Sequence, residues 1–438
     1  MSLETPTAIR TLQRKLYQKA KQEPDYRFYL LYDKVYREDI LHHAYERTRA
    51  NKGAPGVDGQ TFEQIESHGL AEWLEGIREE LRARTYRPQP VRRVMIPKPG
   101  GGERPLGIPM IRDRVVQSAA KLVLEPIFEA DMEPDAYGYR PRRSAHNAIQ
   151  KVHKLLCAGY SDVVDADLSK YFDTIPHSEL LKSVARRIVD RDVLHLIKMW
   201  LKVPVEERDK NGKRRITGGR SSRCGTPQGG IVSPMLANLY MNRFLKYWRI
   251  TERSRAFRAQ IVNYADDFVI LSRGHAVQAR DWTRGVMARL GLTLNEAKTS
   301  IKGAREESFH FLGYTFGPHR YKPDGHWYLG ASPSKKSRQR VKRKVADLLV
   351  PGNVGRWEEV RDRLNLVLRG WSTYFSYGSR ATAYREVNNY VAERVRHFLK
   401  RRQKVQSRGT IRFGRERIFG ALGVTRLGPP AQTACAFR

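Results

Sequence analysis

Two adjacent carboxylates, Asp266 and Asp267, stand between two short apolar runs of the sequence. Residues 261–262 precede the pair and residues 268–271 follow it, and this pattern predicts two short strands joined by a tight turn. Carboxylate oxygens on a turn that buried strands hold in place can bind a divalent metal ion. The pair therefore predicts a metal site at the tip of a hairpin.

A second acidic strand lies upstream. Residues 163–168 form an apolar strand pattern that carries carboxylates, and the period of two along a strand places Asp165 and Asp167 on one face. If the two acidic strands are neighbours, three carboxylates come together as a cage for metal ions. Enzymes that transfer phosphoryl or nucleotidyl groups use two metal ions held in this way.

Residues 91–108 predict a hairpin of a different kind, with three glycines at its tip. The glycines let the backbone approach a ligand closely, and Lys98 and Arg104 flank them. Two cations on such a hairpin suit a triphosphate, whereas the alternative for an isolated hairpin is a solvated turn. Nucleases also use clustered acids but do not need to hold a triphosphate, so the combination favours nucleotidyl transfer over hydrolysis.

The composition indicates what this chemistry acts on. The 438 residues include 81 Lys or Arg and 46 Asp or Glu, which gives a formal net charge of +35. A surplus of this size favours nucleic acid as the partner, although a basic surface that only keeps the protein soluble is an alternative. Almost half of the surplus falls in residues 335–417, which hold 23 Lys or Arg against 7 Asp or Glu.

The composition also excludes several classes of protein. There is no apolar run of about 18 residues, so we expect no membrane span and no membrane partner. The first residues lack the apolar core of a signal peptide. Cys157, Cys224 and Cys435 are far apart in the sequence, which favours neither a disulfide framework nor a zinc knuckle. A reducing cytosol fits these features.

Helices must position the two hairpins. Apolar residues spaced by three and four predict amphipathic helices in residues 1–85, interrupted by a Gly/Pro-rich loop at 51–59. Ser233 and Pro234 predict the N-cap and the first residue of another helix. After residue 330 the same spacing predicts a small helical bundle, whose cations form a candidate nucleic-acid surface.

Seven blocks of the sequence, in their order, resemble the group II intron-encoded reverse transcriptases, which are also called maturases. The blocks are residues 96–99 with 104–109, 137–141, 165–173, 227–230, 264–267, 294–299 and 311–314. The resemblance implies an α+β fold with the right-hand architecture of a polymerase, in which fingers, a palm with an antiparallel sheet and a helical thumb surround the substrates.

The resemblance also implies a domain order. It gives an N-terminal helical extension and the start of the fingers at 1–85, the fingers and palm at 86–330, the helical thumb or maturase-specific domain at 331–404, and a short basic DNA-binding tail at 405–438. Residues 368–375 and the basic helix that follows resemble the thumb, which in this family grips primer and template and binds the intron RNA. Because no cluster of paired Cys and His follows residue 405, we expect a bacterial member without an endonuclease domain.

The resemblance assigns roles at the metal site. Two Mg²⁺ ions, or Mn²⁺ in their place, would be bound by the carboxylates of Asp167, Asp266 and Asp267 and by the backbone carbonyl of Leu168. Asp165 would support these ligands. Lys298 would protonate the pyrophosphate leaving group, unless it is a solvated lysine.

Other residues would contact the substrates. Lys98 and Arg104 would hold the triphosphate of a dNTP, and Gln228 would contact the incoming nucleotide and the template. Phe172 occupies the position of the steric gate that rejects ribonucleotides, with a core aromatic as the alternative. The template would be contacted by the side chains of Tyr137, Tyr139 and Arg140, although a Tyr-Gly-Tyr turn can equally be structural.

Three functions are compatible with the sequence. The first is an RNA-directed DNA polymerase encoded by a group II intron, with dNTPs, an RNA template, a DNA primer or target and the intron RNA as partners, and with roles in splicing and retrohoming. The second is an RNA-binding splicing cofactor whose polymerase activity is incidental. The third is a domesticated reverse transcriptase of phage defence or DNA repair. We expect a bacterial cytoplasmic protein associated with the nucleoid, and the oligomeric state stays open.

Overall fold

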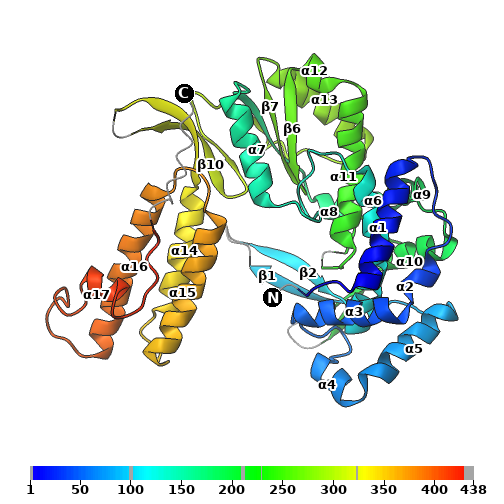
Figure 1. Ribbon diagram of the computed structural model, residues 1–438, viewed down its shortest axis with the longest axis horizontal. Coiled ribbons are helices and arrows are strands. Elements are labelled where there is room, and N and C mark those ends of the chain that lie inside the picture. Colours follow the sequence, from blue (N-terminus) through cyan, green and yellow to red (C-terminus); the bar gives the residue numbers. More distant parts are fainter. Residues whose placement is uncertain (1–2, 98–101, 209–212, 228, 322–323, 429–438) are drawn as a thin grey trace. The chain divides into compact units, whose positions relative to one another are not determined.

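The computed structural model describes residues 3–97, 102–208, 213–227, 229–321 and 324–428 (Figure 1). The chain forms two compact units. Unit 1 comprises residues 1–144, 166–268 and 277–299, and unit 2 comprises residues 145–165, 269–276 and 300–438. Helices and mainly antiparallel strands occur in both units, which confirms the predicted α+β class. The domain boundaries after residues 85, 330 and 404 stay predictions.

The N-terminal part of unit 1 is helical, as its apolar spacing predicts. Its helices are α1 (Thr7–Gln22), α2 (Tyr32–Val35), α3 (Glu38–Ala50), α4 (Phe62–Ser67) and α5 (Leu70–Arg82). The loop predicted at 51–59 is confirmed, and Thr61 ends it by forming a capping box with Gln64 at the start of α4. Helix α6 (Ile111–Asp131) contacts α1 and α3 and is buried along most of its length, so it forms the centre of this helical layer.

The hairpin predicted at residues 91–108 is confirmed as strands β1 (Val91–Pro97) and β2 (Glu103–Ile108), with Arg104 opposite Ile96. Strand β1 also pairs in parallel with β4 (Pro204–Arg208), and β4 pairs antiparallel with β5 (Arg214–Gly218). The resulting sheet has the order β2-β1-β4-β5. Arg104 therefore lies on β2, the edge strand of this sheet, which pairs with β1.

The acidic strands lie in a second sheet. Its strands are β3 (Asp162–Asp167), β6 (Ala259–Tyr264), β7 (Asp267–Ser272) and β8 (Ser300–Gly303), in the order β6-β7-β3-β8. The strands predicted on either side of the Asp266 turn are thus confirmed as β6 and β7. Because β7 and β3 are neighbours, the two acidic segments come side by side, as a shared metal site requires.

Helices lie between the strands of this sheet in the sequence or directly before them. They are α7 (Ala145–Cys157), α8 (Tyr171–Thr174), α9 (His177–Ala185), α10 (Arg191–Leu201), α11 (Ser233–Ile250), α12 (Arg253–Ala256) and α13 (Ala276–Arg289). The ring of Phe244 in α11 lies 5.7 Å from that of Phe268 in β7, and both side chains are buried. This contact packs α11 against the strand that follows the two carboxylates.

One helix boundary differs from the prediction. Helix α11 begins at Ser233, with Val232 as its N-cap and Pro234 in its first turn. The Ser233 hydroxyl donates a hydrogen bond to the carbonyl oxygen of Pro227 at 2.9 Å. The prediction that Ser233 is the N-cap was therefore wrong by one residue, because its hydroxyl ties the helix to the preceding loop instead of accepting from a helical N–H.

Unit 2 contains a small sheet and a helical bundle. The sheet has the order β11-β10-β9, from strands β9 (Phe309–Phe311), β10 (Tyr314–Arg320) and β11 (Trp327–Pro333). The bundle consists of α14 (Lys335–Leu348), α15 (Trp357–Tyr374), α16 (Ala381–Arg402) and the short α17 (Arg415–Phe419). No helix in the described part of the chain is long and apolar enough to cross a membrane.

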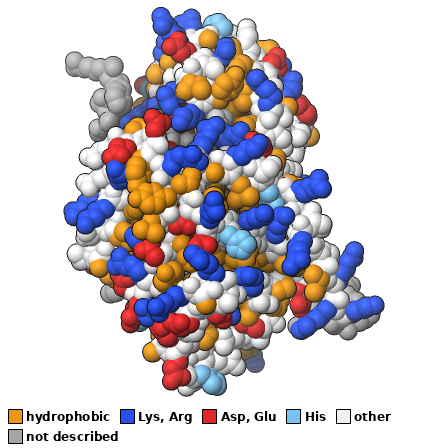
Figure 2. All heavy atoms as spheres, turned by 90° about the vertical axis from the view of Figure 1, so that its right-hand side faces the viewer, with side chains coloured by type: hydrophobic (Ala, Val, Ile, Leu, Met, Phe, Trp, Pro, Cys, Tyr) orange, Lys and Arg blue, Asp and Glu red, His pale blue; other side chains and the backbone are white. Residues whose placement is uncertain are grey.

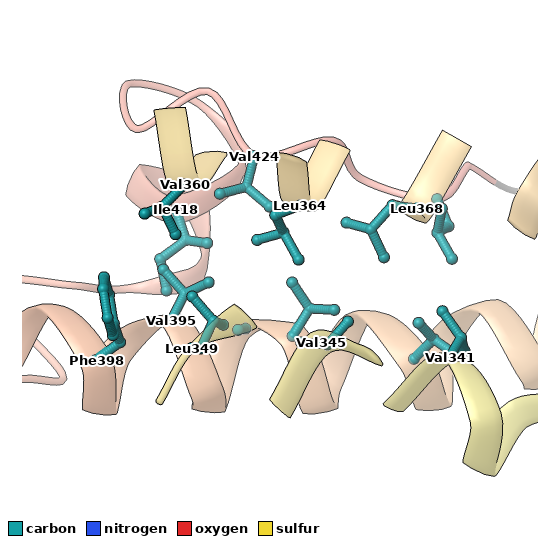
Figure 3. Close-up of a cluster of buried hydrophobic side chains, with 14 of the residues drawn as sticks. Val341, Val345, Leu349, Val360, Leu364, Leu368, Val395, Phe398, Ile418 and Val424 are labelled. Atoms are coloured by element: carbon teal, nitrogen blue, oxygen red, sulfur yellow. The ribbon is translucent and has the colours of Figure 1, made fainter. Parts of the chain in front are cut away.

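The apolar stripe predicted on α16 forms the core of this bundle. Its residues Tyr384, Val387, Val391, Val395 and Phe398 are all buried in one cluster with side chains of α14 and α15. In Figure 3 the α14 side chains Val341 and Val345 point toward the α15 side chains Leu368 and Leu364. The apolar faces therefore meet inside the bundle and leave the Lys- and Arg-rich faces outward.

Candidate functional site

The turn between β6 and β7 carries the adjacent carboxylates in a fixed conformation. Ala265 has a φ of +59°, in the left-handed region, so the chain reverses within two residues. The Asn263 side chain donates to the Ala265 carbonyl oxygen at 2.8 Å. Gly138 lies against the turn so closely that a Cβ there would be 2.5 Å from the backbone nitrogen of Ala265. The turn is held by its own strand and by the segment that contains Gly138.

The third carboxylate, Asp167, is held by a segment far from it in the sequence. The backbone N–H of Asn295 donates to the carbonyl oxygen of Asp167 at 2.8 Å. Lys298 Nζ donates to Asp167 Oδ2 at 2.8 Å, and Asn295 Nδ2 donates to the same oxygen at 3.3 Å. Leu168 is buried, and its backbone forms an antiparallel bridge with Leu294. These contacts fix the end of β3.

Lys298 connects the three carboxylates electrostatically. Its pKa is raised, first by the hydrogen bond to Asp167 and then by the negative charges of Asp167, Asp267 and Asp266. The pKa of Asp266 is raised mainly by burial, and the charge of Asp167 adds to the effect while Arg104 and Lys298 oppose it. Charges perturb each other's pKa in this way only when they are near neighbours. The three predicted acids and Lys298 therefore share one site.

The site is not a closed metal cage. Among the described residues, no three Asp, Glu, His or Cys side chains are close enough together to form a ready-made metal cluster. Lys298 holds one oxygen of Asp167. The donor set nonetheless fits a hard divalent cation, because it consists of carboxylate and backbone carbonyl oxygens.

The cationic hairpin reaches this site. Arg104 is exposed on β2, and its charge lowers the pKa of both Asp266 and Tyr139, partly offsetting the effect of burial on each. An exposed guanidinium next to the carboxylates is suited to holding a phosphate group of a bound nucleotide. Lys98 and Gln228 lie outside the described residues, so their predicted contacts stay predictions.

Phe172 is the second residue of α8 and is half-buried, whereas its neighbour Tyr171, the first residue, is buried. Tyr171 donates a hydrogen bond from its hydroxyl to the carbonyl oxygen of Ala237 at 2.6 Å, and its ring lies 5.7 Å from that of Phe172. The core position at this turn is therefore taken by Tyr171. A partly accessible Phe172 is compatible with the predicted steric gate, which stays a prediction.

The three residues predicted to contact the template differ in exposure. They are Tyr137, Tyr139 and Arg140. Arg140 is only 6% exposed; it forms an ion pair with Glu129 at 2.7 Å and donates to backbone carbonyls of residues 133 and 136. Its guanidinium holds the loop, and the predicted contact of Arg140 with the template stays a prediction. Tyr137 is also buried. Tyr139 is 51% exposed and its pKa is raised by burial and by Asp266, so it alone borders the acidic site.

Three residues of the site escaped the sequence analysis. Asn263 and Gly138 shape the turn that carries Asp266, and Asn295 holds Asp167. Each lies inside or next to a block that the resemblance already contained. A glycine between two tyrosines was a possible signal for a close backbone approach, but its partner could not be read from the sequence.

Comparisons with known proteins agree with this geometry. Residues 96–316 match the family described as reverse transcriptase (RNA-dependent DNA polymerase), and residues 338–414 match the group II intron, maturase-specific domain. The predicted right-hand polymerase fold, with its palm and fingers, is confirmed by the first match. The second match lies in the basic helical bundle.

Relatives among characterised proteins support the same assignment. Protein YkfC of Escherichia coli K12 is 35% identical over 367 residues, which cover 75% of this chain and 94% of that protein. The group II intron-encoded protein LtrA of Lactococcus lactis is 35% identical over 223 residues, covering 50% of this chain and 35% of LtrA. The putative COX1/OXI3 intron 1 protein of Saccharomyces cerevisiae is 28% identical over 327 residues, covering 63% and 38%. The chain thus spans little more than a third of these two intron proteins.

The matched ranges contain both the acidic site and the basic bundle. The resemblance predicted from seven motifs is confirmed, and with it a family whose members use divalent metal ions and act on nucleic acid. The chain belongs to the reverse transcriptases, which are RNA-directed DNA polymerases, and within them to the group II intron maturases.

Proposed function

We propose that this protein extends a DNA primer on an RNA template with dNTPs and that it binds group II intron RNA and assists its splicing. The observation that carries the polymerase role is that β7, which follows the Asp266–Asp267 turn, is the neighbour of β3, at whose end Lys298 Nζ donates to Asp167 Oδ2 at 2.8 Å. Nucleotidyl transfer needs acids that hold metal ions beside cations that hold phosphates. Arg104, next to Asp266, supplies such a cation.

Asp167, Asp266, Asp267 and the Leu168 carbonyl would hold two Mg²⁺ ions, or Mn²⁺ in their place. Bound there, the ions would activate the primer hydroxyl and offset charge on the leaving group. Asp167 is oriented for this task by Lys298 and Asn295. Asp266 is half-buried with a raised pKa, so a cation that offsets its burial favours its ionised form.

The other predicted residues would handle the nucleotide. Arg104 and Lys98 would hold the triphosphate, and Gln228 would contact the incoming nucleotide and the template. Lys298 would deliver a proton to the departing pyrophosphate; the hydrogen bond to Asp167 raises its pKa and so holds that proton while the two side chains are in contact. Phe172 would stand below the sugar and reject a 2′-hydroxyl, and Tyr139 would border the template.

Nucleic-acid binding would spread over a much larger surface. Figure 2 shows Lys and Arg side chains scattered over the whole face that it draws, in line with the net charge of +35. The matched maturase-specific domain lies in the segment with 23 Lys or Arg against 7 Asp or Glu. This charge supports binding of the intron RNA. A role in retrohoming and a location with the nucleoid in the cytoplasm of a bacterium belong to the same proposal, which the likeness to the intron-encoded protein of Lactococcus lactis supports.

Primer extension tests the polymerase role. A DNA primer annealed to an RNA template is incubated with Mg²⁺ and either dNTPs or rNTPs, using the wild type, Asp266→Ala and the control Asp281→Ala. Asp281 is a carboxylate on α13 that forms ion pairs with Arg280 and Arg284. We expect DNA synthesis from dNTPs by the wild type and by the control, and none by Asp266→Ala. Full synthesis by Asp266→Ala would show that the acidic site is assigned wrongly.

The basic bundle favours a second candidate, an RNA-binding splicing cofactor in which polymerase activity is incidental. Splicing of a group II intron RNA at low Mg²⁺, with and without the protein, separates the two. If Asp266→Ala loses primer extension but assists splicing as well as the wild type, the two roles reside in different surfaces. A wild type that assists splicing but never extends a primer would favour the second candidate.

A further inference from the structure

A cavity in the helical bundle of unit 2 has a strongly cationic wall. It encloses about 170 Å³, and its polar lining comes from one helix, α16: Arg394, His397, Arg401 and Arg402. Residues three, four and seven positions apart lie on the same face of a helix, so these side chains converge. No Asp or Glu lines the cavity.

The arginines of this wall lack the carboxylate partners that other cations of the bundle have. On α14, Arg338 and Lys342 both form ion pairs with Glu386. In the described part of the chain, no acidic side chain forms an ion pair with Arg394, Arg401 or Arg402. Neighbouring like charges on one helix face repel each other, so an anion in the cavity would relieve an unfavourable interaction.

Part of this charge has a structural use. Arg402 donates to the carbonyl oxygen of Gly355 at 2.7 Å, and Arg394 donates to that of Leu349, which ends α14, at 3.4 Å. The bond to Leu349 satisfies the C-cap carbonyl of α14, a common role for arginine, and the bond to Gly355 holds the loop before α15. A guanidinium has five N–H donors, however, and the Nε of Arg394 is buried with no hydrogen-bond partner in the described structure. Capping alone leaves donors of both side chains unused.

The rest of the lining is apolar. Leu349, Pro351 and Phe398 complete the cavity, and the guanidinium of Arg402 lies 5.3 Å from the centre of the Phe398 ring. That contact fixes the side chain of Arg402 before any ligand arrives. A wall of guanidinium groups on one side and aliphatic or aromatic groups on the other matches a phosphate joined to a sugar and a base.

We propose that this cavity binds one backbone phosphate of the intron RNA, together with the nucleoside attached to it. The proposal rests on the proposed RNA-binding role of the bundle and names the residues that carry part of it. Planar guanidinium groups donate in pairs to the two non-bridging oxygens of a backbone phosphate, so several arginines around one cavity suit this anion.

Salt-dependent RNA binding tests the proposal with a matched pair of variants. Arg401→Gln removes a cation from the cavity, and Arg385→Gln removes an exposed cation from the same helix that does not line it. Dissociation constants for the intron RNA are measured between about 50 and 200 mM salt, the range over which phosphate contacts change affinity strongly. Both variants change the net charge equally, so nonspecific attraction affects them alike.

We expect Arg401→Gln to weaken binding about tenfold or more, the range of a hydrogen bond to a charged group. It should also reduce the slope of log affinity against log salt by about one phosphate contact, or 0.7–0.9. Arg385→Gln should weaken binding less than Arg401→Gln does, because it loses only the general attraction of one exposed charge. Since Arg394 and Arg401 would hold the same phosphate, the double variant Arg394→Gln/Arg401→Gln should lose no more slope than one contact. Equal losses for Arg401→Gln and Arg385→Gln would overturn the proposal.

Inorganic phosphate separates RNA from a small free anion as the ligand. If phosphate raises the melting temperature of the wild type saturably while Arg401→Gln leaves RNA affinity unchanged, the cavity takes a free anion and the proposal is wrong. Primer extension by the same preparations distinguishes a failure of the cavity proposal from a failure of the proposed function. A wild type that neither binds the RNA nor extends a primer removes the proposed function, whereas a wild type that does both leaves only the cavity in question.

Discussion

Replacing Gly138 by alanine should damage the acidic turn without touching a carboxylate. The added Cβ would lie 2.5 Å from the backbone nitrogen of Ala265, where ordinary contact begins at 3.4 Å, so the turn and the Gly138 segment must separate by most of an ångström. Backbone atoms on both sides cannot rotate away as a flexible side chain could. Overpacking of this kind costs about 1–3 kcal/mol of the free energy of unfolding.

The larger effect should fall on catalysis. Asp266 follows Ala265 directly, and a displacement of about 1 Å in a catalytic group can lower a rate about 100-fold. We therefore expect Gly138→Ala to reduce the rate of primer extension about 100-fold and to lower the melting temperature by about 2–10 °C. The assays are single-turnover extension with saturating dNTP and thermal unfolding followed by circular dichroism.

Gly76→Ala provides the matched control. Gly76 lies within α5, and a Cβ there would meet no atom within 4 Å. Alanine in a helix interior is about 0.5–1 kcal/mol more favourable than glycine, so this variant should extend primers normally and melt at the same or a higher temperature. If Gly138→Ala extends primers within twofold of the wild type, the packing of Gly138 against the turn does not position Asp266 and the reasoning fails.

Three further predictions follow from the same contacts. If Lys298 delivers a proton, Lys298→Gln should lower the extension rate by about 100-fold or more. The melting temperature should change little, because the Lys298 side chain is 65% exposed. An unchanged extension rate would exclude the proton-delivery role. Phe172→Ala should reduce the preference for dNTPs over rNTPs in single-nucleotide incorporation, and an unchanged preference would exclude a steric gate there. His153, whose ring bonds to the Tyr377 hydroxyl and the Leu329 carbonyl, has its pKa lowered by burial. The neutral His153 ring therefore stabilises the fold above about pH 6.5, and this contribution is lost as the pH falls below that value. The melting temperature should fall more steeply between pH 7 and 5 for the wild type than for His153→Gln. Parallel curves of melting temperature against pH would contradict this.

The sequence predicted the parts of the site that depend on local pattern. Alternation of apolar and acidic residues placed Asp165 and Asp167 on β3, and the apolar runs around Asp266 placed β6 and β7. Glycines between short strands placed the hairpin that carries Arg104. In each case the signal lies within a few residues, because strand period and turn composition are local properties.

The remaining features depend on contacts between distant segments. Lys298 and Asp167 are 131 residues apart in the sequence, and their hydrogen bond exists only because the 294–299 block returns to the end of β3. The ion pair of Arg140 with Glu129, 11 residues away, could likewise not be read from the Tyr-Gly-Tyr-Arg motif. Ser233 had the composition of an N-cap, but the carbonyl of Pro227 competes for its hydroxyl. Local propensity could not foresee these tertiary partners.

Metal rescue tests most directly whether the acidic site is the catalytic centre. Asp266→Cys replaces a hard oxygen ligand by a thiolate, which binds Mg²⁺ poorly and softer ions such as Cd²⁺ well. Primer extension on an RNA template would be measured for the wild type and the variant with Mg²⁺ alone and with Cd²⁺ added. We expect the variant to be inactive with Mg²⁺ and to recover part of its activity with Cd²⁺, without a gain for the wild type. Extension by the variant at the wild-type rate with Mg²⁺ alone would contradict a role for Asp266 in metal-dependent nucleotidyl transfer.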